Sequence, residues 1–391
     1  MRYNFDKITA RRGTNSLKYD FAAERGRPEG ILPLWVADMD FAVANEITEG
    51  LKKAVNHGIY GYSEAKDSYF EAVADWMRRY HGWKVEKDWL VKTPGVVFAI
   101  AAAIRAFTKE GEGVMIQNPV YYPFREVIED NNRRLVDNTL VEKNRQYTMD
   151  LEDFEQKILQ NQVKLFILCN PHNPVGRVWT REELTAVAEI CLRHGVYIVS
   201  DEIHHDFVYP GYEHTVFATI DERLKDITIT CTSPSKTFNL AGLQVSNIFI
   251  ANEALRKQFS REIAKTGYSQ LNTLGLVACE CAYRGGRQWL EQLKQYLKDN
   301  LEFVREYLER NLSMIHIVEP EGTYLLWLDF RELGLSGKEL EYLIVNKAGL
   351  WLDAGDIFGS CGEGFERVNI ACPRTVLQEA LQRLTFAVKI K

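Results

Sequence analysis

The sequence predicts an α/β fold: a mostly parallel β-sheet with helices on both faces, plus a smaller α+β domain. Short apolar runs typical of buried strands alternate with helical patterns between residues 113 and 232, and this alternation is typical of βαβ units. A long helical pattern at 288–311 then leads into a separate group of strand and helix patterns. We therefore expect an N-terminal arm (1–45) packed on a small domain (286–391), and a large domain (46–285) between them.

Residues 1–40 show no clear periodicity in the spacing of their apolar residues, so we expect an extended arm there. Helical spacing of apolar residues then predicts helices at 43–57 and 66–80, and Gly58 and Gly82 are placed to end them. Between the two helices lies a turn with two tyrosines, Tyr60-Gly61-Tyr62.

Strand patterns at 113–117, 163–169, 197–200 and 227–232 define the predicted parallel sheet, with a helix at 181–194. In such sheets a ligand binds outside the carboxyl ends of the strands. Four residues lie just past predicted strand ends, so we expect them to meet at one edge: Tyr121, Asn173, Asp201 and Lys236.

The remaining patterns complete the large domain and build the small one, with Gly285-Gly286 as the expected linker. Strands are predicted at 245–250, 314–318, 323–330 and 367–371. Helices are predicted at 98–107, 254–265, 271–283, 338–347 and 374–388.

The composition excludes several classes of function. A net charge of −6 in 391 residues gives no basic field, so we expect no nucleic-acid partner. The longest apolar stretch, from Val96, is broken by Arg105 well short of a membrane span, and the first residues lack the apolar core of a signal peptide. Seven scattered cysteines indicate reduced core residues and no zinc site, as in a cytoplasmic protein.

The residues at the predicted sheet edge are those that an enzyme using pyridoxal 5′-phosphate (PLP) requires. Lys236 follows an apolar strand and stands among hydroxyl residues, so its amine is the candidate for covalent attachment of the cofactor. Asp201 is the candidate partner of the pyridine nitrogen, although an N-cap or turn would equally explain an aspartate there. Asn173, which could instead be a simple turn residue, would hydrogen-bond the ring hydroxyl.

The phosphate and the ring of the cofactor need further partners. The turn at Gly95, Val96 and Val97 opens a helix, and a helix N-terminus favours an anion. A helix start chosen for packing alone is the alternative. Ser233 and Ser235 would add hydroxyl groups to the phosphate, and Tyr121 would stack on the ring.

Several motifs resemble those of the fold-type I PLP enzymes, the aspartate aminotransferase superfamily. They are N-P-H-N-P-V-G from residue 170, S-D-E-I-H from 200 and S-P-S-K-T-F-N-L-A-G from 233. More narrowly, the chain resembles the cystathionine β-lyase and cysteine C-S lyase branch. This likeness rests on R-R-G-T-N-S-L-K-Y-D from 11, V-A-D-M-D-F from 36, T-P-G-V-V from 93, P-V-Y-Y-P-F from 119 and F-E-R-V-N-I-A from 365.

The resemblance implies roles that spacing does not show. Arg367 matches the arginine that binds the substrate α-carboxylate, and the Ala37 backbone falls near that group. Tyr122 matches a phenol close to the substrate, where it would assist proton transfer. Tyr62 matches a tyrosine that reaches the cofactor phosphate of the neighbouring subunit, so a homodimer with shared active sites is implied.

Two residues depart from the aminotransferase pattern. His204, which we include among the cofactor-binding residues, stands where aminotransferases usually carry a tyrosine. Gln244 stands where they usually carry a phosphate-binding arginine. The first departure agrees with the lyase branch, and the second removes a fixed charge from the phosphate site.

We therefore predict a PLP-dependent C-S β-lyase that cleaves cystathionine and related L-cysteine S-conjugates to pyruvate, ammonia and a thiol. Lys236 would remove the Cα proton. An aminotransferase of the same fold is the enzymatic alternative, and a regulatory binding role, as in some relatives of this branch, is the alternative from another class.

Overall fold

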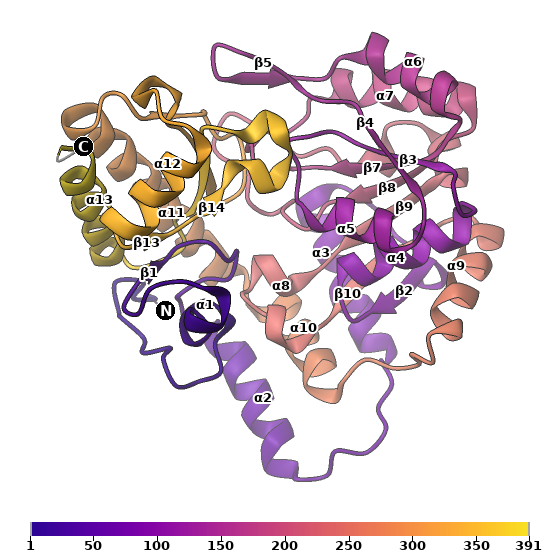
Figure 1. Cartoon of the computed structure of the whole chain (residues 1–391). Coiled ribbons are helices and arrows are strands. Elements are labelled where there is room, and N and C mark those ends of the chain that lie inside the picture. Colours follow the sequence, from indigo (N-terminus) through magenta and orange to yellow (C-terminus); the bar gives the residue numbers. More distant parts are fainter. Residues whose placement is uncertain (1, 390–391) are drawn as a thin grey trace.

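The computed structural model describes residues 2–389 and contains a seven-stranded sheet (Figure 1). Strand β10 is antiparallel to both of its neighbours, whereas the pairs from β9 to β4 are parallel. The predicted mostly parallel sheet is thus confirmed. In spatial order the strands are β2 (Leu90–Thr93), β10 (Ser246–Phe249), β9 (Thr228–Thr232), β8 (Tyr197–Asp201), β7 (Val163–Cys169), β3 (Gly113–Ile116) and β4 (Arg134–Asp137).

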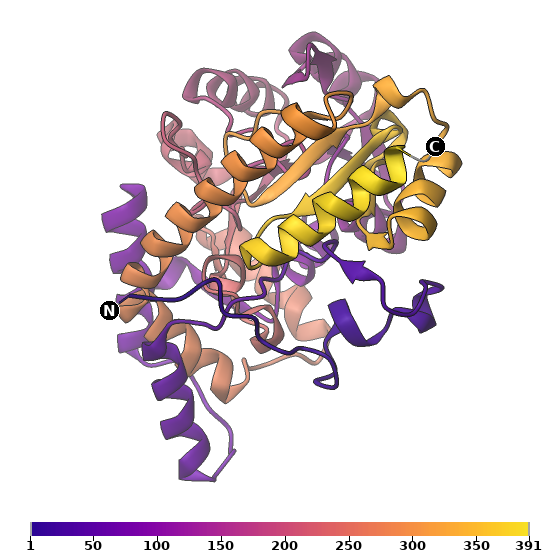
Figure 2. The same cartoon turned by 90° about the vertical axis from the view of Figure 1, so that its left-hand side faces the viewer.

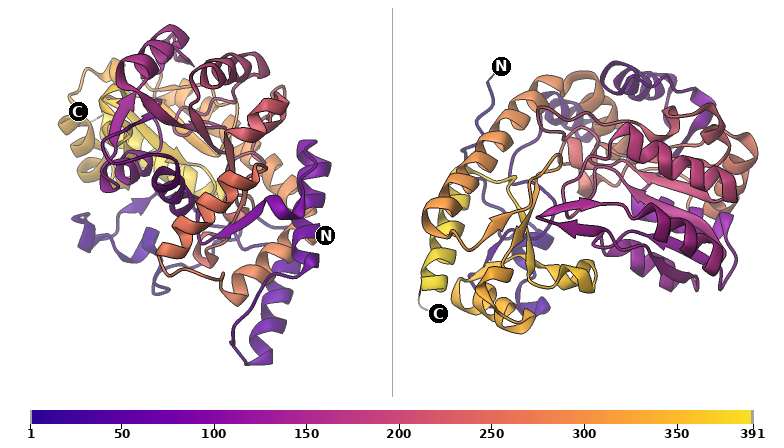
Figure 3. Two further views of the ribbon diagram at one scale, coloured as in Figure 1. Left: turned by 90° about the vertical axis from the view of Figure 1, so that its right-hand side faces the viewer. Right: turned by 90° about the horizontal axis from the view of Figure 1, so that it is seen from above.

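Helices cover both faces of this sheet (Figure 3). Side chains alternate along a strand, so in β7 Leu165 and Ile167 pack into one apolar cluster and Phe166 and Leu168 into another. The first cluster includes α4 (Val96–Phe107), α5 (Pro123–Asp130) and α9 (Glu253–Lys265), and the second includes α6 (Leu151–Asn161) and α7 (Arg181–His194).

The C-terminal part contains a four-stranded antiparallel sheet. Its spatial order is β11 (His316–Ile317), β12 (Leu325–Asp329), β15 (Phe365–Asn369) and β14 (Asp353–Ala354). The long α11 (Arg287–Asn311) and the C-terminal α13 (Arg374–Lys389) lie side by side along it (Figure 2). The short α12 (Gly337–Tyr342) belongs to the same part.

The N-terminal arm packs on this C-terminal part. Its strand β1 (Leu32–Pro33) pairs in parallel with β13 (Leu350–Trp351). In the short α1 (Leu17–Asp20), the Lys18 ammonium binds the buried Asp40 carboxylate at 2.9 Å. Both residues belong to the arm, and removing one partner of a buried ion pair leaves the other charge uncompensated, so this pair stabilises the fold of the arm itself.

Two helices near the N-terminus lead to an exposed segment. Helix α2 (Asn45–His57) ends at Gly58, whose φ of 72° is left-handed, as a glycine permits. It packs on α10 (Thr273–Gly285), as does α3 (Asp67–His81), and α2 projects from the body of the molecule (Figure 1). Between α2 and α3 the chain exposes three large apolar side chains: Ile59, Tyr60 and Tyr62.

Most predicted elements lie within a few residues of where the sequence places them, with several differences. Helix α4 begins at Val96 rather than residue 98. The Gly285-Gly286 pair joins α10 to α11, with Gly285 as the last residue of α10. Lys236 lies in a one-turn helix, α8 (Pro234–Thr237). Several elements were not predicted, among them β1, β2, β4, α5, α6 and the hairpin of β5 (Val141–Lys143) and β6 (Gln146–Thr148). The three-domain division itself stays a prediction.

No helix within residues 2–389 is both long and apolar enough to cross a membrane.

Candidate active site

A cavity of about 140 Å³ lies at the carboxyl ends of the parallel strands, where the sequence placed the site. The structure brings the four strand-end residues to it from four different segments. Most of the other predicted cofactor residues line it too, and so does Ala37, predicted to lie near the substrate carboxylate. These cofactor residues are Gly95, Val96, Val97, His204, Ser233 and Ser235. The fold therefore assembles in one place groups that lie up to 200 residues apart in sequence.

Lys236 is held with its amine inside the cavity. Ser233 caps the helical turn α8 by accepting a hydrogen bond from the Ser235 backbone N–H at 3.0 Å, and this turn presents the lysine. Lys236 Nζ donates to the Ala37 carbonyl oxygen at 3.3 Å. Burial, with the nearby Arg367 charge, lowers the pKa of Lys236 to about 8. The amine is consequently a usable base or nucleophile near neutral pH.

Asp201 ends β8 and is also buried. Burial raises its pKa to about 7, although the Ile203 N–H, which donates to Oδ1 at 3.1 Å, and the Lys236 charge act in the opposite direction. A buried carboxylate with so few partners is favourable only beside a cation. His204 stands close by, its Nδ1 is buried without a hydrogen-bond partner, and burial holds its pKa well below the usual range. The Asp201 carboxylate has few partners for its charge, and His204 Nδ1 has no hydrogen-bond partner. Both groups therefore suit a polar or charged ligand in the cavity.

The opposite part of the cavity suits an anion. Gly95 precedes α4, and no side chain caps this helix end, so the first backbone N–H groups of a twelve-residue helix are open to a ligand. Ser233 Oγ and Ser235 Oγ lie 2.8 Å apart beside it. Gln244, the residue in place of the usual arginine, also lines the cavity.

Arg367 lies on β15 of the C-terminal sheet, next to the cavity residue Asn173. Its guanidinium donates to Asn173 Oδ1 at 3.0 Å and to the Trp35 carbonyl oxygen at 2.9 Å, and it pairs with Asp353. Its Nε is buried without a partner. Arg367 is thus not the surface charge that a lone arginine beside a strand would suggest. A fixed guanidinium with a free donor is suited to a carboxylate.

Besides Arg367, two predicted residues, Tyr122 and Tyr62, are not among those that line this cavity. The Tyr122 ring lines a neighbouring cavity, together with Trp35 and Asp353. Burial raises the pKa of the Tyr122 phenol. Tyr62 is fully exposed on the segment after α2, so within one subunit it does not reach the site.

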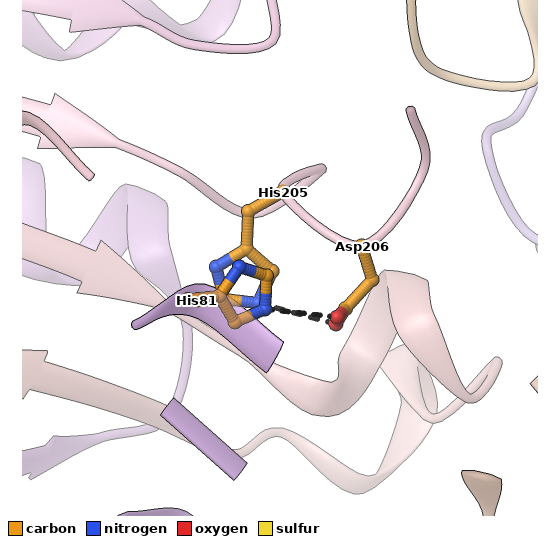
Figure 4. A group of neighbouring side chains, drawn as sticks. All are labelled: His81, His205 and Asp206. Atoms are coloured by element: carbon orange, nitrogen blue, oxygen red, sulfur yellow. Dashed lines mark hydrogen bonds and ion pairs between the residues drawn. The ribbon is translucent and has the colours of Figure 1, made fainter. Parts of the chain in front are cut away.

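A buried polar cluster supports the turn that carries Lys236 (Figure 4). Asp206 Oδ2 accepts from Thr237 Oγ1 at 2.6 Å, and Oδ1 lies 3.0 Å from His81 Nε2. The His81 and His205 rings stack with centroids 4.0 Å apart. Although burial opposes it, the neighbouring His205 and His81 hold the pKa of Asp206 well below its usual range. The ionised Asp206 anchors Thr237 and with it the adjacent lysine.

Sequence reasoning missed the residues that bind the arm to the site. Tyr324 Oη donates to the Ala37 carbonyl oxygen at 2.8 Å, the same oxygen that accepts from Lys236. The Asn239 side chain makes three hydrogen bonds to the backbone of Met39 and Phe41. Asn239 belongs to the motif that contains Lys236, but only the folded chain shows what its amide contacts.

Comparison with known proteins identifies the class. The family described as aminotransferase class I and II matches residues 31–384, so the chain belongs to this family. The fold and the family resemblance predicted from the motifs are confirmed.

Individual relatives are similar over nearly the whole chain. Cystathionine beta-lyase PatB of Bacillus subtilis is 43% identical over 385 residues, covering 98% of this chain and 100% of the relative. Protein MalY of Escherichia coli is 32% identical, with 99% of each chain covered. The crystal structure of cystalysin from Treponema denticola, which contains a pyridoxal 5′-phosphate cofactor, has a TM-score of 0.96 at 42% identity and full coverage of both chains.

Proposed function

We propose that this protein is a PLP-dependent C-S β-lyase acting on cystathionine and related L-cysteine S-conjugates. The observation that carries the proposal is the pairing of a buried lysine with a buried aspartate in one cavity. The pKa of Lys236 is lowered to about 8 and that of Asp201 is raised to about 7. Such opposed shifts are typical of a catalytic site.

The cavity fits the cofactor in three respects. The open N-terminus of α4 with the Ser233 and Ser235 hydroxyls suits the phosphate. The buried Asp201 carboxylate suits a protonated pyridine nitrogen, and the unpartnered His204 Nδ1 offers a further hydrogen-bonding group. When bound, pyridoxal phosphate supplies an electron sink for the charge that develops at the substrate Cα.

The residues of the chain supply binding and proton transfer. Arg367 binds the α-carboxylate and so orients the Cα–H bond toward Lys236. The Lys236 amine takes the Cα proton, and departure of the sulfur from Cβ as a thiolate completes the elimination. Water then converts the remaining three-carbon fragment to pyruvate and ammonia. For each conjugate one water is consumed and one thiol, one pyruvate and one ammonia are formed.

The lyase assignment over transamination is supported by the relatives and by two site residues. Relatives at 43% and 33% identity carry the name cystathionine beta-lyase. His204 and Gln244 both line the cavity at the positions that depart from the aminotransferase pattern. A thiolate leaves readily, so elimination competes with the reprotonation that transamination requires.

We further propose that the active enzyme is a cytoplasmic homodimer with shared sites. The exposed Tyr62, together with Ile59 and Tyr60, forms a surface that suits a partner subunit. The seven cysteines are all unpaired, as in a reducing compartment.

Purified protein loaded with PLP and incubated with cystathionine, without any keto acid, tests the proposal. Equal amounts of pyruvate and thiol over many turnovers are the expected result, with loss of turnover in Lys236→Ala. Activity that depends on added keto acid would instead establish an aminotransferase. A regulatory effect in cells that survives Lys236→Ala would favour the regulatory role.

A further inference from the structure

A second cavity of about 390 Å³ adjoins the proposed substrate site. Trp35, Tyr122 and Asp353 line it. The Arg367 guanidinium binds the Trp35 carbonyl and the Asp353 carboxylate from the other side. The same guanidinium donates to Asn173, which lines the first cavity. Arg367 therefore contacts residues of both cavities, and a long substrate bound to it could extend from one cavity into the other.

Three arginines line this second cavity and give it positive charge: Arg25, Arg27 and Arg125. The Trp35 and Trp351 rings stack with centroids 4.4 Å apart and planes 12° apart. The Arg25 guanidinium lies 5.3 Å from the Trp35 ring centre, and that of Arg27 lies 5.6 Å from the Trp351 ring centre. Stacking on buried aromatic rings limits the freedom of these long side chains, which lowers the entropy cost of binding an anion.

The charges of this cavity are only partly balanced within the chain. Arg27 pairs with Glu341, and Asp353 pairs with Arg367. Among residues 2–389, Arg25 and Arg125 have no carboxylate partner, and Glu126 is the acid on the cavity wall that is left to oppose them. Trp35 Nε1 adds a buried donor without a hydrogen-bond partner. The cavity thus offers two guanidinium groups to a ligand.

We propose that this cavity binds the group attached to the substrate sulfur and selects conjugates in which that group carries a carboxylate. The inference rests on the proposed lyase function and adds its substrate class. With the α-carboxylate on Arg367, the S-linked group extends past Tyr122 into the second cavity, where Arg25 and Arg125 meet its carboxylate. Conjugates with a neutral S-linked group bind without this contact.

Two synthetic substrates of nearly identical shape test the proposal. They are S-carboxymethyl-L-cysteine and S-carbamoylmethyl-L-cysteine. The first carries a carboxylate at the end of the S-linked group, and the second carries a neutral amide in the same place. The holoenzyme is expected to show a kcat/KM about tenfold higher for the carboxymethyl conjugate, since two partly exposed ion pairs are made. In the double variant Arg25→Gln/Arg125→Gln, the ratio of the kcat/KM values for the two conjugates should fall to about one. This change should come from a higher KM for the carboxymethyl conjugate alone.

The carbamoylmethyl conjugate serves as an internal control, because its unchanged turnover shows that the double variant folds and binds its cofactor. Arg310→Gln, which removes an exposed arginine from the distant α11, is the matched control and should keep the wild-type ratio. An equal kcat/KM for the two conjugates in the wild type would overturn the proposal, as would an unchanged ratio in the double variant.

Failure of the lyase function is distinguished by a binding measurement. If neither conjugate is cleaved, titration calorimetry of the holoenzyme compares L-2-aminoadipate with its side-chain amide, in which CH₂ replaces the sulfur of each conjugate. A preference for the dicarboxylate that disappears in the double variant supports the anion-binding cavity without the lyase. Equal binding of the two ligands refutes it.

Discussion

Replacing Asp201 by asparagine is expected to stabilise the protein while abolishing its function. The carboxylate is buried with one backbone hydrogen bond, and its pKa is raised from 3.8 to about 7. Asparagine has nearly the same shape, can accept the same bond from the Ile203 N–H and carries no charge. The variant therefore removes the cost of an ionised group in an apolar site but also removes the partner of the cofactor nitrogen.

The magnitude follows from the pKa shift. The unfolded chain ionises Asp201 near pH 3.8 and the folded chain near pH 7, so the wild type loses stability relative to the variant as pH rises through this window. Three pKa units correspond to about 4 kcal/mol. This shift already includes the favourable Lys236 charge interaction, which lowers the pKa of Asp201. We expect the variant to be more stable by about 2–4 kcal/mol at pH 8 and by less than about 1 kcal/mol at pH 4.

Urea unfolding of the cofactor-free proteins at pH 4, 6 and 8 measures this difference, at one protein concentration because the proposed dimerisation would contribute to stability. Asp88→Asn, which changes an exposed aspartate, should show no such pH-dependent gain. The reasoning is refuted if Asp201→Asn is no more stable than the wild type at pH 8, or if its advantage does not grow with pH.

Three other substitutions have defined outcomes. Arg367→Lys should raise KM for amino-acid substrates about tenfold, because an ammonium cannot keep the contacts to Asn173, Trp35 and Asp353 and also bind a carboxylate; unchanged steady-state kinetics would contradict its proposed role. Asn239→Ala removes three hydrogen bonds to the arm, at about 1 kcal/mol each, and should speed hydrogen exchange at residues 37–41; unaltered exchange there would argue against it. Tyr62→Phe should weaken PLP binding, and mixing it with Lys236→Ala subunits should restore one intact site per heterodimer; no recovery on mixing would exclude shared sites.

Much of the site was predictable because strand ends and motifs are local features. A parallel sheet places the carboxyl ends of its strands at one edge, so Asn173, Asp201 and Lys236 could be placed together from their position after strand patterns alone. The helix ends at Gly58 and Gly82 could also be predicted from local sequence. Both glycines adopt the left-handed conformation expected after a helix. The role of Arg367 came from the family resemblance, because an arginine in a strand has no local signature.

Other features depend on contacts between distant segments, which no local pattern reports. The residue at which α10 ends is one such feature, because α10 packs on α2 and α3 and stays helical through Gly285. Tyr324 and Asn239 gain their roles only because the arm folds back over the site.

The sequence by itself predicted the alternation of strands and helices, the central strands of the sheet, the edge at which the candidate residues meet and the residue types proposed to bind the cofactor. The tertiary structure decided the electrostatics, because the pKa values of Lys236 and Asp201 depend on how deeply both are buried and on charges from other segments. It also decided that arginines and tryptophans from the arm, from α5 and from β13 meet in a second cavity. Burial and long-range contact are properties of the folded chain, so these features could not be predicted from local sequence.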